Sequence, residues 1–232
     1  MSAYAELAVT TNYSFLRGAS HPQELVERAA ALGYPAIGIA DRNTLAGVVR
    51  AYSALQELEG PRPRLLIGAR LVFRDGTPDI LAYPQDRAAY GRLCRLLSAG
   101  KLRAPKGECY LAFEDLLKWQ EGLLLIVLPP YPLRQQVEEA EATKVWNEKH
   151  SDWKEVPDAR APKAEDVIAA LRILRDVAPN RVWLGLSMPF LGDDLRRLRH
   201  WKSVAEKTGV PLIATNDAVS YTHLTLPTIY SV

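Results

Sequence analysis

Charged and hydroxyl side chains follow several apolar segments of this chain, and their order suggests a shared site. Asp41 ends one segment and Asp217 follows another, while Thr10 and Arg70 end two more. In α/β barrels the functional residues lie at the C-terminal ends of the strands, so we expect these four side chains to meet at one end of the fold. Two carboxylates alone cannot hold a catalytic metal cluster, because such a cluster needs further imidazole or carboxylate donors.

Each aspartate also has a purely structural interpretation. Asp41 could cap the helix that follows it, as aspartate does at many helix N-termini. Asp217 could serve as the turn residue after its strand. The sequence leaves both alternatives open.

Histidine and cysteine supply little that would bind a metal ion. The two cysteines, Cys94 and Cys109, are too few for a disulfide framework and lack the spacing of a zinc site, which fits a reducing, cytosolic setting. The four histidines fall outside any ligand pattern, and we interpret each as a surface or capping residue: His21, His150, His200 and His223.

The composition is that of an ordinary globular protein without bulk attraction to nucleic acid. Of the 232 residues, 48% are hydrophobic, enough for a core, and the net charge is only +2. Arginine is concentrated at residues 196–199 and 62–64, where we expect solvated faces, with a DNA contact as the alternative. We expect neither a signal peptide nor a membrane-spanning segment, because the N-terminus is polar and the apolar runs are short.

Strand and helix patterns alternate along most of the chain, which predicts βα units and a mainly parallel sheet. Apolar segments predict strands at residues 5–10, 35–40, 64–68, 123–128, 182–187 and 210–215, and a hairpin that joins 70–74 to 79–83. Helical spacing predicts helices at residues 21–32, 44–57, 86–98, 114–119, 164–177 and 191–208. Ser20 is the expected N-cap of the first helix, and Asn43 or Thr44 that of the second.

Two architectures fit this alternation, an α/β barrel or a doubly wound sheet. Residues 129–163 show neither periodicity, and we expect them to contain an irregular insertion at about 132–162.

Four segments in order resemble the PHP (polymerase and histidinol phosphatase) domain found at the start of bacterial C-family, DnaE-like DNA polymerases. They are residues 5–18 (AELAVTTNYSFLRG), 39–47 (IADRNTLAG), 81–98 (LAYPQDRAAYGRLCRLLS) and 210–217 (VPLIATND). Each is weakly specific alone, but together and in this order they are typical of the family. The resemblance implies a distorted (β/α)7 barrel, incomplete at its C-terminus, with residues 1–218 as the PHP domain.

The same resemblance implies that most metal ligands of the family are lost. Metal-binding members carry a histidine-rich motif in the first segment, and Glu6, Ala8 and Thr10 stand at the corresponding positions. In the second segment Arg42 replaces the histidine that follows Asp41. We therefore expect remnant metal-pocket positions without a metal ion and without a catalytic residue.

Two arginines at former ligand positions suggest how the charge of the pocket is balanced. Arg70 replaces a glutamate that bridges metals in active relatives, and Asp217 completes the set of remnant positions. Guanidinium groups stay protonated at any relevant pH. We expect Arg42 and Arg70 to supply the positive charge that metal ions once supplied, by pairing with Asp41, Asp217 or Glu6.

The ligand pattern resembles the error-prone branch of these polymerases. This implies the N-terminal PHP domain fragment of an error-prone DNA polymerase, which serves damage-tolerant replication and repair in the cytoplasm. DNA and deoxynucleotides would be bound, with magnesium, by polymerase domains that this chain lacks, and accessory subunits would be partners, with no membrane involved. The fragment itself would be structural and carry no cofactor. The alternative is a free-standing PHP-type metal-dependent phosphoesterase.

Residues 219–232 look foreign to the family. Their sequence is what in-frame translation of a transposon-derived sequencing adapter would give. We therefore expect the natural sequence to depart near Ala218 and the last residues to be a non-native tail. A short divergent tail is the alternative.

Overall fold

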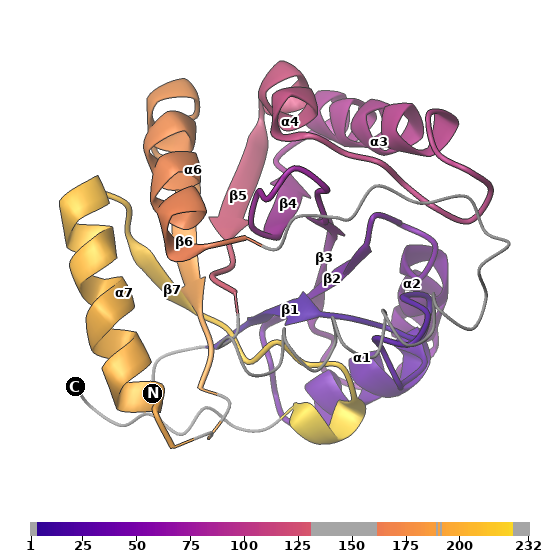
Figure 1. The fold of residues 1–232 in the computed structure, drawn as a ribbon. Helices are drawn as coiled ribbons and strands as arrows, with labels where there is room; N and C mark the ends of the chain where they lie inside the picture. The colour runs from indigo at the N-terminus through magenta and orange to yellow at the C-terminus, as the bar shows by residue number, and fades with distance from the viewer. Residues whose placement is uncertain (1–3, 131–161, 189, 191, 225–232) are drawn as a thin grey trace, which may run out of the picture.

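The computed structural model describes residues 4–130, 162–188, 190 and 192–224 (Figure 1). Seven strands form one curved sheet in the order in which they follow along the chain. Neighbouring strands are parallel except where β4 lies antiparallel between β3 and β5. The helices lie around the outside of this curved sheet (Figure 1), so the distorted α/β barrel is confirmed and the doubly wound sheet is not.

The elements alternate as the apolar spacing predicts. The strands are β1 (Glu6–Val9), β2 (Ala36–Arg42), β3 (Arg64–Leu71), β4 (Ile80–Pro84), β5 (Leu123–Val127), β6 (Val182–Leu186) and β7 (Leu212–Ala214). The helices are α1 (Pro22–Ala31), α2 (Val48–Glu57), α3 (Arg87–Leu102), α4 (Phe113–Trp119), α6 (Ala164–Val177) and α7 (Asp194–Thr208), followed by the 3-10 turn η1 (Tyr221–His223).

Both predicted helix caps are wrong, for local physical reasons. The N-cap of α1 is His21 rather than Ser20, and the His21 backbone N–H donates to the Glu24 carboxylate at 2.8 Å. The second helix starts only at Val48, because Asn43 adopts a left-handed φ of 50° and its side chain exchanges two hydrogen bonds with the backbone of Val72. An asparagine tolerates this conformation better than most residues.

Some other boundaries also differ from the sequence prediction. The residues at 64–68 and 70–71 form one continuous strand, β3, whose end pairs with β4 as the predicted hairpin requires. Helix α3 continues to Leu102, beyond its predicted end at residue 98, because Gly100 and the residues before it extend its buried face.

The interior of the barrel is filled by apolar side chains and crossed by one tyrosine. The Tyr83 hydroxyl donates to the carbonyl of Leu7 on β1. Gly38 and Gly68 leave room for this ring, since a Cβ at either glycine would lie 2.5 Å from a Tyr83 atom. Burial raises the pKa of Tyr83, so the phenol stays protonated. Tyr83 therefore joins β4 to β1 across the interior as a neutral group.

Hydrogen bonds from loops join the first and last strands. In the described residues β1 and β7 do not pair directly, but the Thr10 N–H donates to the Ala218 carbonyl at 2.9 Å and the Ala19 N–H to the Val219 carbonyl at 2.8 Å. Leu224, further along, is buried against the core that α1 and α2 share with the sheet.

Two predictions on chain organisation fall on segments that are partly outside the described residues. These are the irregular segment at 129–163 and the non-native tail at 219–232, and both stay predictions. Within the described part of the chain, no helix combines the length and apolar character that crossing a membrane requires.

Candidate functional site

The polar residues gather at one end of the barrel, which we call the mouth. Here β1, β2, β3, β5, β6 and β7 end, and the antiparallel β4 begins. The structure brings Thr10, Asp41, Arg42, Arg70 and Asp217 to the mouth, because each lies at or just after the end of a strand. Glu6 and Ala8 lie within β1 itself.

Glu6 is a fully buried carboxylate held by four donors. It accepts hydrogen bonds from the Tyr4 hydroxyl at 2.5 Å and the Ala8 N–H at 2.7 Å. Across the gap to β7 it accepts from the Thr215 hydroxyl at 2.8 Å and the Asn216 N–H at 2.7 Å. All four donors are neutral. Glu6 therefore ties the first strand to the segment after the last.

Asp41 is also buried, with 1% of its surface exposed, and it holds the loop that follows β1. It accepts from the Thr11 N–H at 2.8 Å, the Thr11 hydroxyl at 2.9 Å and the Ser14 hydroxyl at 2.7 Å. Burial raises the pKa of Asp41, while the hydrogen bonds from Ser14 and Thr11 act in the opposite direction. The helix-cap interpretation is wrong, because both carboxylate oxygens of Asp41 accept hydrogen bonds from this loop and α2 begins only at Val48.

Arg70 is the most buried of the arginines predicted to lie in the pocket, with 7% of its surface exposed. Its Nη2 donates to Oδ1 of Asp217, and its Nε lies 4.0 Å from Oδ2 of Asp79. Asp217 occupies the left-handed region with φ of 50°. The ion pair therefore links the end of β3 to the segment after β7, the last strand of the sheet.

Arg42 pairs with an acid that the sequence interpretation did not include. Its Nη1 lies 3.1 Å from Oδ2 of Asp79, just before β4. Burial lowers the pKa of Arg42, and the Asp79 carboxylate opposes that shift. Of the three acids predicted as arginine partners, Asp217 is confirmed by its pair with Arg70. Pairing with Asp41 or Glu6 is wrong, because neutral donors already surround both carboxylates. The predicted hairpin could have indicated Asp79 as a partner, since it places the start of β4 beside the end of β3.

The positions of Ala8 and Thr10 offer neither imidazole nor carboxylate to a divalent cation. Ala8 packs in the apolar interior with Ala40 and Leu81. The Thr10 hydroxyl is buried and has no hydrogen-bond partner among the described residues. Nowhere in the described ranges do three or more histidine, cysteine, aspartate or glutamate side chains form a group that could hold a metal ion. The donor set at this mouth does not fit the metal centre of the family, and no chemical step follows from one.

The histidines do not enlarge this donor set. His21 contacts the Asn12 side chain at 2.8 Å on the surface, and the His200 ring packs edge-on against Trp201. His223 lies in η1, and His150 is outside the described residues.

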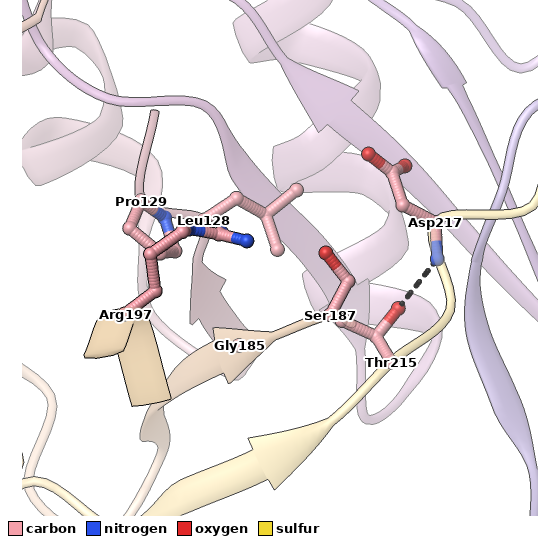
Figure 2. A pocket seen from close by; sticks show the side chains of 7 residues that line it. All are labelled: Leu128, Pro129, Gly185, Ser187, Arg197, Thr215 and Asp217. Atoms are coloured by element: carbon pink, nitrogen blue, oxygen red, sulfur yellow. Dashed lines mark hydrogen bonds between the residues drawn. The ribbon is translucent and has the colours of Figure 1, made fainter. Parts of the chain in front are cut away.

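A small pocket opens at the mouth between β6 and β7 (Figure 2). Arg197 of α7 lines it together with Ser187, Thr215 and Asp217, and the Asp217 N–H donates to the Thr215 hydroxyl at 3.2 Å. Arg197 lies 3.7 Å from Asp194, one turn earlier on the helix. The sequence analysis predicted neither Arg197 nor Ser187 at this pocket.

Comparison with known proteins identifies the domain and its relatives. The family model of the PHP domain matches residues 6–161. An error-prone DNA polymerase of Rhodopseudomonas palustris (strain BisB5) is 54% identical over 222 residues, which cover 95% of this chain and 17% of that protein. An error-prone DNA polymerase of Brucella suis biovar 1 (strain 1330) is 48% identical over 225 residues, 96% of this chain and 18% of that protein. The chain thus spans less than a fifth of the length of these relatives.

Among solved structures, an amidohydrolase from Chromobacterium violaceum shares the fold. It superposes with a TM-score of 0.52 at 15% identity and covers 97% of this chain and 93% of that one. At this level of identity the likeness concerns the fold alone.

Proposed function

The chain belongs to the PHP domain family, and from this premise we propose that it is the PHP domain of an error-prone, C-family DNA polymerase. The observation that carries the proposal is the 54% identity to such a polymerase across 95% of this chain. Identity at this level over a whole domain concerns the particular branch of a family and not only its fold.

The activity of the whole enzyme would reside outside this chain. We propose that further domains bind DNA and deoxynucleotides and use magnesium for nucleotidyl transfer during damage-tolerant replication and repair. A polymerase that copies a bacterial chromosome works in the cytoplasm, so we propose that location. Accessory polymerase subunits are the expected protein partners.

The PHP domain itself would act as a structural support. At positions where the family resemblance implies metal ligands, this chain has a methyl group, a hydroxyl and two guanidinium groups, at Ala8, Thr10, Arg42 and Arg70. Arg70 links β3 to the segment after β7, a connection that a metal ion would otherwise make through its ligands. We propose that these ion pairs keep the mouth in shape and that the domain has no phosphoesterase activity of its own.

Metal analysis and a phosphatase assay test the structural role. We expect the purified chain to contain no stoichiometric zinc or manganese by mass spectrometry. We also expect no manganese-dependent hydrolysis of an aryl phosphate. Turnover that Asp41→Asn abolishes would instead support the alternative, a free-standing metal-dependent phosphoesterase.

Sequencing the source DNA across the codon for Ala218 tests the polymerase assignment and the proposed domain boundary. We propose that residues 1–218 form the domain and that residues 219–232 are not native to it. The reading frame should then continue past this codon into a polymerase region with paired acidic residues. A frame that ends at Val232 would contradict both proposals for this molecule.

A further inference from the structure

Helix α7 carries more positive charge than the whole chain does in net terms. Its residues Asp194–Thr208 include five lysines or arginines and two acids, whereas the net charge of the chain is +2. The opposite face of the helix is apolar, since Trp201, Val204 and Ala205 are each only 6% exposed. The positive charge is therefore displayed outward by a helix that is fixed on the sheet.

Three cations define the outward surface, which we call the basic face: Arg196, Arg199 and Lys202. All three are exposed, and within the described part of the chain no ion pair or hydrogen bond engages their side chains. Residues three apart are neighbours on a helix surface. At 1.5 Å rise per residue, the face extends about 9 Å along the helix axis.

The basic face begins at Arg196, next in sequence to an arginine that lines the pocket at the mouth. Arg197, adjacent in sequence to Arg196, turns inward to the pocket that Asp217 also lines (Figure 2). The two consecutive arginines thus have different roles, because one is held within the mouth near Asp194 and the other faces solvent.

We propose that the basic face binds the sugar-phosphate backbone of duplex DNA. Free cations at helical spacing match a row of phosphates by charge, and such contacts are independent of base sequence. Single-stranded DNA is usually bound by stacking of bases on exposed aromatic rings. Trp201, the one Phe, Tyr or Trp of this helix, is buried, so the face suits the backbone of a duplex. The choice of DNA rests on the proposed polymerase function, whereas the surface itself does not.

Fluorescence anisotropy with a short, labelled, mixed-sequence duplex tests the proposal on the 232-residue chain. We expect binding at about 50 mM salt that weakens with a slope of about −2.7 in log K against log salt, the value for three phosphate contacts. The triple variant R196Q/R199Q/K202Q should bind at least ~10-fold more weakly and lose most of that slope. Circular dichroism establishes that the variant is folded.

The triple variant R50Q/R64Q/R87Q is the matched control. These arginines are exposed on other elements, and the control removes the same charge as the test variant. We expect its affinity to stay within about twofold of the unsubstituted chain. Equal losses in both variants would overturn the proposal, since they would show diffuse attraction, and so would absence of binding by the unsubstituted chain. Metal content and the gene sequence are read independently, so failure here leaves the proposed function standing.

Discussion

The buried carboxylates of β1 and β2 and the arginines that end β2 and β3 are bound by partners of two different kinds. Glu6 and Asp41 are almost completely buried and bond only to neutral hydroxyl and backbone donors. Arg70 and Arg42 bind acids instead, and the Arg42–Asp79 pair is more than a quarter exposed on each side. The same family pocket therefore contains a hydrogen-bonded part and an ion-paired part.

This difference follows from the cost of burying charge. An ionised group removed from water needs several fixed donors or a well-placed opposite charge. Glu6 and Asp41 have such donors from neighbouring loops, so they need no cation. Each arginine has an acid partner instead, and the Arg42–Asp79 pair lies closer to solvent than the Arg70–Asp217 pair does. We infer that Glu6 contributes more to stability than the ion pairs do, and the following variants test that order.

Glu6→Ala should cause the largest loss of stability. The change leaves four donors without their acceptor and removes the link between β1 and the residues after β7. Each buried donor left unsatisfied costs about 1–3 kcal/mol, so we expect the free energy of unfolding to fall by about 3 kcal/mol or more. Urea denaturation followed by circular dichroism measures the change.

Two further variants serve as controls for that measurement. Glu27→Ala removes an exposed glutamate from α1 and should change the free energy of unfolding by no more than about 0.5 kcal/mol. Glu6→Gln keeps the size of the side chain and one acceptor, so its loss should lie between the two. Similar losses in the free energy of unfolding for Glu6→Ala and Glu27→Ala would mean that Glu6 does not hold β1 to the segment after β7.

The Arg70–Asp217 pair should rank second. A double-mutant cycle of Arg70→Ala and Asp217→Ala isolates the interaction, which we expect to contribute about 1–3 kcal/mol because both side chains are largely buried. Arg70→Lys should recover only part of it, since a lysine cannot approach Asp217 and Asp79 with the same planar fork. A coupling energy near zero would mean that the pair does not link β3 to the segment after β7.

Much of the fold could be predicted because apolar spacing determines which segments become strands and helices. Some helix and strand boundaries could not be predicted, because contacts between residues distant in sequence determine them. Asn43 is held in a left-handed conformation by hydrogen bonds to Val72 on a distant segment, which delays the start of α2. No local pattern around Asn43 contains that information.

The sequence predicted where the site lies in the fold, but it predicted only some of the contacts between its side chains. Strand ends place Asp41, Arg70 and Asp217 at one mouth, and the family resemblance names the same positions. Two of the four donors to Glu6, Thr215 and Asn216, lie more than two hundred residues away in sequence, so spacing alone could not reveal them.

The Arg42–Asp79 pair should contribute less than the two preceding interactions. The two side chains are 27% and 29% exposed, so water and salt screen their attraction. We expect a double-mutant cycle of Arg42→Ala and Asp79→Ala to give less than about 1 kcal/mol, and less still when the salt concentration is raised. A coupling that equals or exceeds that of Arg70 with Asp217 would overturn the order inferred from exposure.

Asp41→Asn should change the free energy of unfolding least at neutral pH. Its effect should instead appear in how that free energy depends on pH. Burial raises the pKa of Asp41 in the folded state, so the native protein takes up this proton at a higher pH than the unfolded chain does. The contribution of this group to the free energy of unfolding therefore rises as the pH falls through the folded pKa, and it levels off below about pH 4, where the unfolded chain is protonated too.

Asparagine cannot titrate, so the difference in free energy of unfolding between the unsubstituted chain and Asp41→Asn isolates this contribution. Urea titrations of both proteins from neutral pH to about pH 4 should show the unsubstituted chain gaining stability relative to the variant. A difference that stays constant, or that falls as the pH is lowered, would mean that the hydrogen bonds from Thr11 and Ser14 outweigh desolvation. Asp41 would then be a carboxylate stabilised in its charged form. It would differ from the acids that pair with arginine only in having neutral hydrogen-bond donors.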